Sequence, residues 1–163
     1  LRIEVAPVGE LRADGADLIR FLFTANRNTS LQPIEKVASG GEMSRLMLSL
    51  KALVAAHAQL PTIIFDEIDT GVSGAIADKM GEIITNLSES LQVVNITHLP
   101  QVASKGDHHF LVYKEEVPEG TLTRIRKLST EARVAEIAKM LSGSAVTAAA
   151  TEQARLLLGL EKL

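Results

Sequence analysis

The stretch from Val37 to Arg45, VASGGEMSR, places two glycines between a serine and the start of a helical apolar pattern. Ser39 can cap this helix, and Glu42, three residues on, can bond back to the cap, which makes a capping box. Gly40 and Gly41 are not needed for capping. They let the backbone approach another molecule or chain segment closely, and they leave unpaired N–H groups at the positive end of the helix dipole. The stretch therefore indicates either an ordinary capped helix or a phosphate site.

Outward from this stretch, apolar residues alternate between helical and strand periods. Helical spacing predicts helices at 42–58, 75–87 and about 100–105, one that Ser129 or Thr130 can cap, and a last one that Ser144 opens. β-rich runs predict strands at 62–65, 91–97, 110–113 and 122–128, the last two as a hairpin, and an antiparallel pair at 2–8 and 17–25. We therefore expect one α/β domain over residues 1–163, with a parallel sheet flanked by helices and an antiparallel N-terminal portion.

The composition excludes several classes of protein. The chain has no cysteine, which rules out disulfides and thiolate metal sites. Its net charge is −3 and its aromatic content 3%, so no basic footprint or base-stacking platform for direct DNA binding is visible. Lys51 interrupts the longest apolar run, so no membrane span is expected. Because the first residue is Leu1 and no signal peptide follows, we expect a segment of a longer, cytoplasmic protein.

Polar residues follow two of the predicted strands. Asp66 and Glu67 come directly after the apolar run 62–65, and Thr97 and His98 follow the next β-rich run. In open α/β sheets, ligands collect at the carboxyl ends of the strands, so these groups can share one cleft. Adjacent carboxylates suit phosphoryl transfer, where one holds Mg²⁺ and the other positions or deprotonates water. The alternative is that the acidic pair merely caps the following helix and that the histidine is a surface residue.

The order and spacing of these stretches resemble the motifs of ABC-type ATPases. SGGE at 39–42 is similar to the signature motif, TIIFDE at 62–67 to the Walker B motif, Asp69 to the D-loop, and Thr97-His98 to the switch histidine. Four longer stretches narrow the resemblance: ASGGEMSR, FDEIDTGVSG, THLPQVA and EARVAEIAKMLSG. Their sequences resemble the RecN family of bacterial DNA repair ATPases, which are related to the structural maintenance of chromosomes (SMC) proteins.

The resemblance implies a role for each matching residue, with ATP and Mg²⁺ as cofactors. Asp66 would bind the water shell of Mg²⁺, Glu67 would be the general base, and His98 would contact the γ-phosphate. The residues implied to touch ATP bound to a second head, across a dimer, are Ser39, Gly40, Gly41, Glu42 and Asp69.

One motif of such ATPases is missing from the sequence. No glycine is followed by lysine, so the phosphate-cradling Walker A loop is absent, and there is no long heptad segment. The resemblance implies that this chain is the C-terminal lobe of the head and that its partner is the Walker A lobe of the same protein. We expect the chain alone to hydrolyse no ATP.

For the complete protein, the resemblance implies a homodimer formed through ATP-bound heads, which binds DNA and acts in double-strand break and recombinational repair. The expected location is the bacterial cytoplasm, in association with the nucleoid and not with a membrane. Two alternatives remain open at this point. The chain could belong to the ATP-binding subunit of a transporter, or it could be a non-catalytic dimerisation module.

Overall fold

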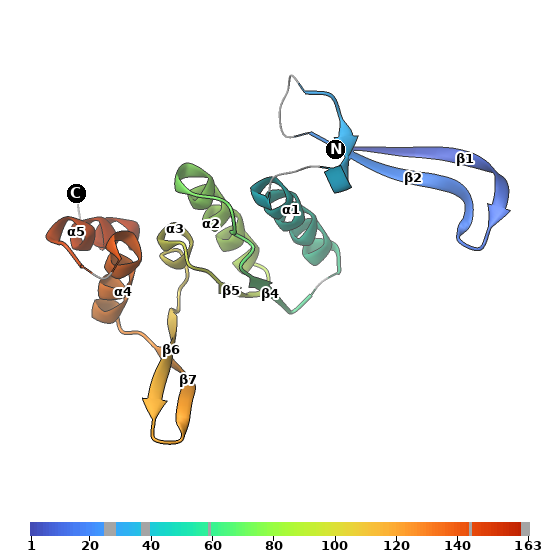
Figure 1. Cartoon of the computed structure of the whole chain (residues 1–163). Coiled ribbons are helices and arrows are strands. Elements are labelled where there is room, and N and C mark those ends of the chain that lie inside the picture. The colour runs from blue at the N-terminus through green and yellow to red at the C-terminus, as the bar shows by residue number, and fades with distance from the viewer. Residues whose placement is uncertain (25–28, 37–39, 59, 144, 161–163) are drawn as a thin grey trace.

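The computed structural model describes residues 1–24, 29–36, 40–58, 60–143 and 145–160 (Figure 1). The strands are β1 (Arg2–Arg12), β2 (Gly15–Phe23), β3 (Gln32–Pro33), β4 (Thr62–Asp66), β5 (Gln92–Ile96), β6 (Phe110–Val117) and β7 (Gly120–Lys127). The helices are α1 (Gly40–Ala58), α2 (Gly74–Ser88), α3 (Pro100–Ala103), α4 (Thr130–Ser142) and α5 (Ala148–Leu157), with a 3₁₀ turn at Ile34–Lys36. No helix in these ranges has both the length and the apolarity that crossing a membrane requires.

The centre of the fold is a parallel pair of strands with helices on one face. β4 and β5 pair in register from Thr62 opposite Gln92 to Asp66 opposite Ile96, and α2 makes the crossover between them. The run TIIFD has the continuous apolar character of a strand in a parallel sheet, as the sequence predicted. Figure 1 shows α1 and α2 lying side by side over this pair.

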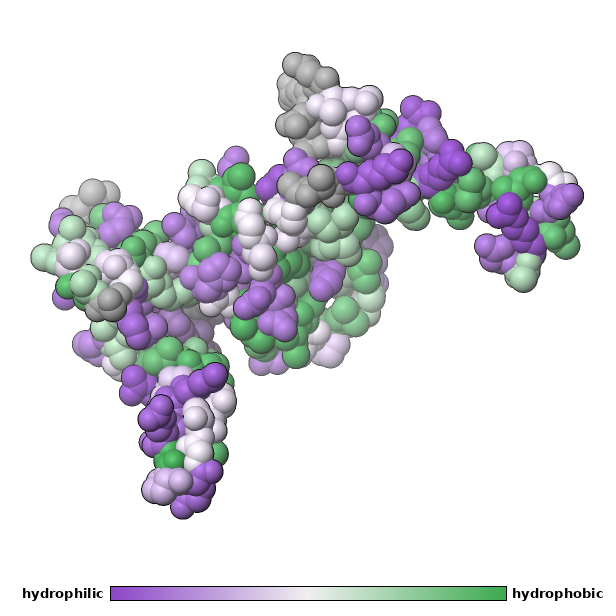
Figure 2. All heavy atoms as spheres, in the orientation of Figure 1, coloured by the Kyte–Doolittle hydropathy of each residue, from purple (hydrophilic) through white to green (hydrophobic). Residues whose placement is uncertain are grey.

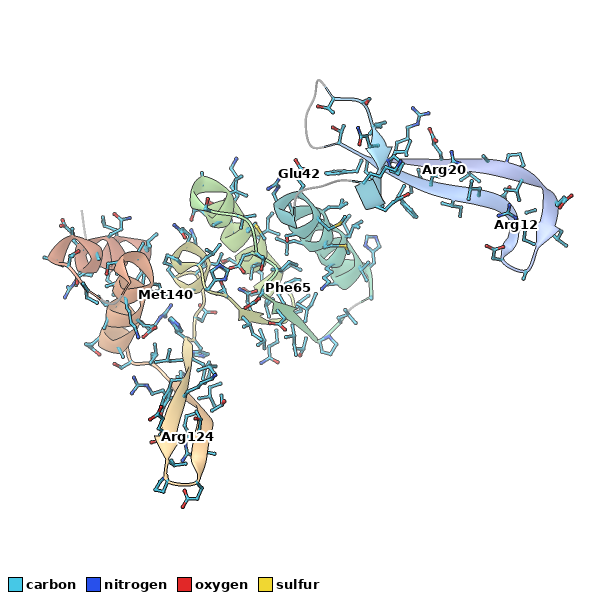
Figure 3. All side chains as sticks on the ribbon, in the orientation of Figure 1. Arg12, Arg20, Glu42, Phe65, Arg124 and Met140 are labelled. Atoms are coloured by element: carbon cyan, nitrogen blue, oxygen red, sulfur yellow. The ribbon has the colours of Figure 1, made fainter. Side chains whose placement is uncertain are left out.

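The covered face of the central pair holds the main core. Phe65 on β4 is fully buried, together with Leu48 of α1 and Met80 of α2 (Figure 3 shows Phe65 below the helices). These three side chains join α1 and α2 to the sheet, because burying side chains of this size contributes about 1.5 to 3 kcal/mol each. The position of both helices relative to β4 therefore depends on this contact.

The opposite face of the same pair is bare. Ile64, Val94 and Ile96 alternate with the core residues and expose 62%, 43% and 51% of their surface. Figure 2, in which hydrophobic residues are green, shows apolar side chains at the surface of the central body. Parallel sheets are normally covered on both faces. In the described part of the chain, nothing covers this one.

Two antiparallel hairpins extend from the central body in different directions (Figure 1). β1 pairs with β2 as predicted, and one face of this hairpin exposes Ile3, Val5, Ile19 and Phe21. β6 pairs with β7 from Phe110 opposite Lys127 to Val117 opposite Gly120. Both hairpins are too thin to enclose a core, so their apolar side chains remain at the surface.

The C-terminal helices form a second, smaller core. Ser129 caps α4 by accepting a hydrogen bond from Ala132 N at 3.3 Å, which agrees with one of the two predicted caps. The last helix begins later than the sequence suggested. Its cap is Thr147, whose hydroxyl accepts from Ala150 N at 3.1 Å, while Ser144 lies outside the described residues. Packing of α5 on α4 through buried alanines selects this start.

Arg133 of α4 ties this second core to the loop after α3. Its guanidinium donates to the carbonyl oxygens of Gly106 at 2.6 Å and of Ser104 and Asp107 at 3.3 Å. His109 lies next to this loop, and its pKa is lowered by burial and by the nearby Arg133 charge. The neutral imidazole is thus favoured, which avoids a second positive charge beside the guanidinium.

The two faces of β4 allow a matched test of the central core. We expect Phe65→Ala to lower the free energy of unfolding by about 3 to 5 kcal/mol, because it leaves a cavity beneath α1 and α2. Ile64→Ala, one residue earlier on the bare face, should cost less than about 1 kcal/mol in this chain, because Ile64 is largely in water already. Urea unfolding of both variants measures the difference, and equal losses would show that the bare face is covered.

Candidate functional site

The parallel register brings the predicted chemical groups to one edge of the sheet. Asp66 ends β4 directly opposite Ile96, which ends β5, and Thr97 follows at once. The backbone N of Glu67 donates to Ile96 O at 3.0 Å, so the two chain segments stay together beyond the strands. Asp66, Glu67 and His98 are all exposed there. The structure therefore places the carboxylate pair and the histidine on neighbouring loops, as the sequence predicted.

Glu67 has an unusual backbone conformation. Its φ is +46°, and it is the one non-glycine residue with positive φ among the residues described. The left-handed region costs a residue with a Cβ about 1 to 2 kcal/mol. The turn that follows fixes it, since Glu67 O accepts from Thr70 N at 3.1 Å and from Thr70 Oγ1 at 2.9 Å. Strained residues of this kind cluster at active sites and ligand-binding turns.

The N-terminal end of α1 rests on the turn after Glu67. Gly41 is buried there, and a Cβ on it would lie 2.6 Å from Gly71 O. Ser44 Oγ lies 2.9 Å from Gly40 O and 3.4 Å from Thr70 O, which joins the same two segments again. The second glycine of SGGE is therefore needed for close backbone approach inside this chain. Gly40, in contrast, has open space where its side chain would be.

Figure 3 shows Glu42 at this N-terminal end of α1. The other half of the predicted capping box, Ser39, lies outside the described residues. The signature-like stretch is thus described from Gly40 onward, and these residues lie beside the turn that follows the carboxylate pair.

Asp69 lies inside the fold. It has no exposed surface, and its Oδ2 accepts a hydrogen bond from Thr97 Oγ1. Its Oδ1 has no partner among the residues described. A carboxylate in this position can act on its own head through Thr97. The contact of Asp69 with ATP on a second head, which the resemblance implies, stays a prediction.

Sequence reasoning singled out Glu67, Asp69 and His98 but gave no role to Thr97, Ser44 or Gly71. No local pattern assigns them one, because each acts on a residue distant in the sequence. The tripeptide THL does allow a hydroxyl to bond two residues ahead, and Leu99 N does donate to Thr97 Oγ1 at 3.0 Å. The sequence allowed this turn but could not show its second bond, to Asp69.

Asp66 and Glu67 fit the metal-binding part of a nucleotide site. Within the described ranges, no cluster of three or more acidic or histidine side chains could hold a metal by itself. Mg²⁺, however, commonly takes only one or two protein carboxylates and keeps water and phosphate oxygens as its other ligands. Exposed Asp66 with Glu67 beside it fits this need. A phosphate cradle would have to come from elsewhere.

The fold is that of an SMC-type ATPase head. The chain resembles a solved SMC head domain with coiled coil and joint from Pyrococcus yayanosii, with a TM-score of 0.61 and 21% identity over 76% of this chain and 22% of that one. It also resembles a structure described under ATP-driven dimerization and DNA-stimulated activation of SMC ATPases, with a TM-score of 0.59 and 18% identity over 88% of this chain and 84% of that one. The expected lobe of an ABC-type head is confirmed.

In sequence, the resemblance to the DNA repair protein RecN is confirmed. The chain is 45% identical to RecN of Bacillus subtilis over 85% of its length, and 44% identical to RecN of Vibrio cholerae over 88%. It spans about a quarter of the length of these relatives, 24% and 26%. No protein-family model matches the chain.

The two glycines of the signature-like stretch provide a matched pair for mutation. Gly41→Ala should lower the free energy of unfolding by about 1 to 3 kcal/mol, because the new methyl group overlaps Gly71 O and the helix or turn must move. Gly40→Ala should be neutral or stabilise by about 0.5 kcal/mol, because its position is open and Ala loses less entropy. Thermal or urea unfolding measures both changes. A Gly41→Ala protein as stable as the unchanged protein would argue against the close contact.

The strain at Glu67 makes a second prediction about stability. Glu67→Gly should be about 1 kcal/mol more stable than Glu67→Ala, because glycine adopts positive φ without cost. At Glu89, whose φ is −66°, the order should reverse, since there glycine only adds freedom to the unfolded chain. The same order at both positions, measured by urea unfolding, would mean that Glu67 is not strained.

Proposed function

We propose that this chain is the C-terminal lobe of a RecN-type, SMC-like ATPase head that acts in the repair of DNA double-strand breaks and in recombination. The observation that carries the proposal is the meeting of three loops: the start of α1, the turn after Asp66 and Glu67, and the segment Thr97–His98. They are joined by the contacts described above. The identity to RecN supports DNA repair as the setting, and favours it over the ATP-binding subunit of a transporter.

Each group at the sheet edge has a distinct role in this proposal. Asp66 holds the water shell of Mg²⁺, which when bound neutralises phosphate charge. Glu67 orients the attacking water and takes its proton. His98 contacts the γ-phosphate from the neighbouring loop. All three side chains are exposed, as groups that meet a nucleotide must be.

The start of α1 is proposed to contact ATP that is bound to a second head. In a symmetric dimer, Ser39, Gly40 and Glu42 would contact ATP bound to that head, with the turn that contains Asp69 near the seam. The open space beside Gly40 supports a contact in which the backbone N–H groups at a helix N-terminus approach phosphate. Gly41 serves the same contact indirectly, by keeping the helix close to the turn.

The Walker A lobe of the same protein is proposed to cover the bare face of β4 and β5. Ile64, Val94 and Ile96 provide the apolar surface for it. The relatives are about four times longer than the matched segment, which leaves room for such a lobe and for a coiled coil. Hydrolysis then requires both lobes, so this chain alone has no turnover.

The complete protein binds DNA in the cytoplasm, at the nucleoid.

Glu67→Gln tests the enzymatic part of the proposal in the complete protein. Loss of the general base should lower the rate of ATP hydrolysis by about 10²- to 10⁴-fold and prolong the ATP-bound dimer. Glu119→Gln, in the turn of the β6–β7 hairpin, should change neither. Phosphate release and size-exclusion chromatography with ATP measure both effects. If the extent of dimerisation changes neither with ATP nor with Glu67→Gln, the chain would instead be a non-catalytic dimerisation module.

A further inference from the structure

The hydroxyl of Thr97 is used in two directions. It accepts a hydrogen bond from Leu99 N at 3.0 Å and donates one to Asp69 Oδ2. A hydroxyl has a single proton to donate, so the whole donor capacity of Thr97 goes to Asp69. The bond from Leu99 closes a short turn around His98. Because the His98 side chain is exposed, this turn and not core packing sets the direction in which the imidazole leaves the backbone.

Asp69 is a firm anchor for this turn. It is fully buried, and its backbone O accepts from Val72 N at 3.3 Å. It also lies two residues after Glu67, whose carbonyl is held by Thr70. The turn that carries Glu67 and the turn that carries His98 are therefore linked twice, by Glu67 N to Ile96 O and by Thr97 to Asp69. The second link ends on a fully buried carboxylate, which strengthens a hydrogen bond.

We propose that Thr97 and Asp69 are positioning residues, which hold His98 at a fixed distance and angle from Glu67 within the same head. This inference rests on the proposed function, because it assigns the pair to the hydrolysis that Glu67 and His98 perform. It also assigns Asp69 a role within its own head. Movement of the turn 67–72 is transmitted directly to His98, since the only side-chain link between the two turns passes through one hydroxyl in the described structure.

The test is a double-mutant cycle in the complete protein. Thr97→Val keeps the shape of the side chain and removes the hydroxyl, and it should lower kcat by about 10- to 100-fold with little change in KM, as a small misplacement of a catalytic group does. Thr97→Ser restores the hydroxyl and should recover most of kcat. In the His98→Ala background, Thr97→Val should cause no further loss, because Thr97 acts through His98.

Several results would overturn the proposal. Equal losses from Thr97→Val with and without His98 would show that Thr97 only supports the fold, as would a failure of Thr97→Ser to recover kcat. Should Thr97→Val not fold, Asp69→Asn replaces it. Asn retains an oxygen that can accept from Thr97 but carries no charge, and its smaller loss of kcat must likewise vanish in the His98→Ala background for the proposal to stand.

A readout without turnover separates this proposal from the ATPase assignment. The protein is labelled with ¹³C-histidine, and the His98 signal is identified by its loss in His98→Ala. Thr97→Val should shift or broaden this signal while Thr97→Ser leaves it in place, and an unchanged signal in Thr97→Val would overturn the positioning role. If Glu67→Gln retains full turnover in the same series, the assignment of Glu67 as general base fails, and if the unchanged protein has no turnover, the ATPase assignment fails, whatever the histidine signal shows.

Discussion

Parallel pairing of β4 with β5 fixes where the chemical groups of this chain can lie. Because both strands run in one direction and end in register, Asp66 and Ile96 finish side by side, and the residues after them emerge at the same edge. An antiparallel pair would have put the carboxylates and the histidine at opposite ends. The crossover helix α2 makes the parallel arrangement possible, and Phe65 holds that helix and α1 to one face of the pair.

A chain of short contacts then turns this edge into one connected unit. Gly41 lies against Gly71, Ser44 reaches Thr70, and Asp69 holds Thr97. None of these contacts belongs to a helix or strand ladder, and each joins segments that are far apart in the sequence. The start of α1 and the loop of His98 do not need to touch one another, because the turn 67–72 contacts both. A change at either segment therefore passes through this turn.

The sequence predicted the central elements well and the site only in part. Helical spacing located α1 and α2, because each of these helices buries one face in the core. Continuous apolar runs located β4 and β5, because such runs are typical of strands in a parallel sheet. The β6 strand continues to Val117, beyond the predicted 110–113, because pairing with β7 extends through polar residues that have no strand-like pattern. The start of α5 was misplaced because Ser144 and Thr147 are both possible caps, and only packing on α4 decides between them. The resemblance matched Asp69 to the D-loop, but no pattern in the sequence indicated its hydrogen bond with Thr97, which lies 28 residues away.

The bare face of β4 and β5 has a consequence for the life of the protein in the cell. An apolar surface that awaits a partner is a site for non-specific association, and the free edges of a short sheet increase that risk. Chaperones and proteases recognise exposed surface of this kind. Under the proposal that a second lobe covers this face, the two lobes would have to meet soon after synthesis, because a lobe without its counterpart would expose the face to quality control.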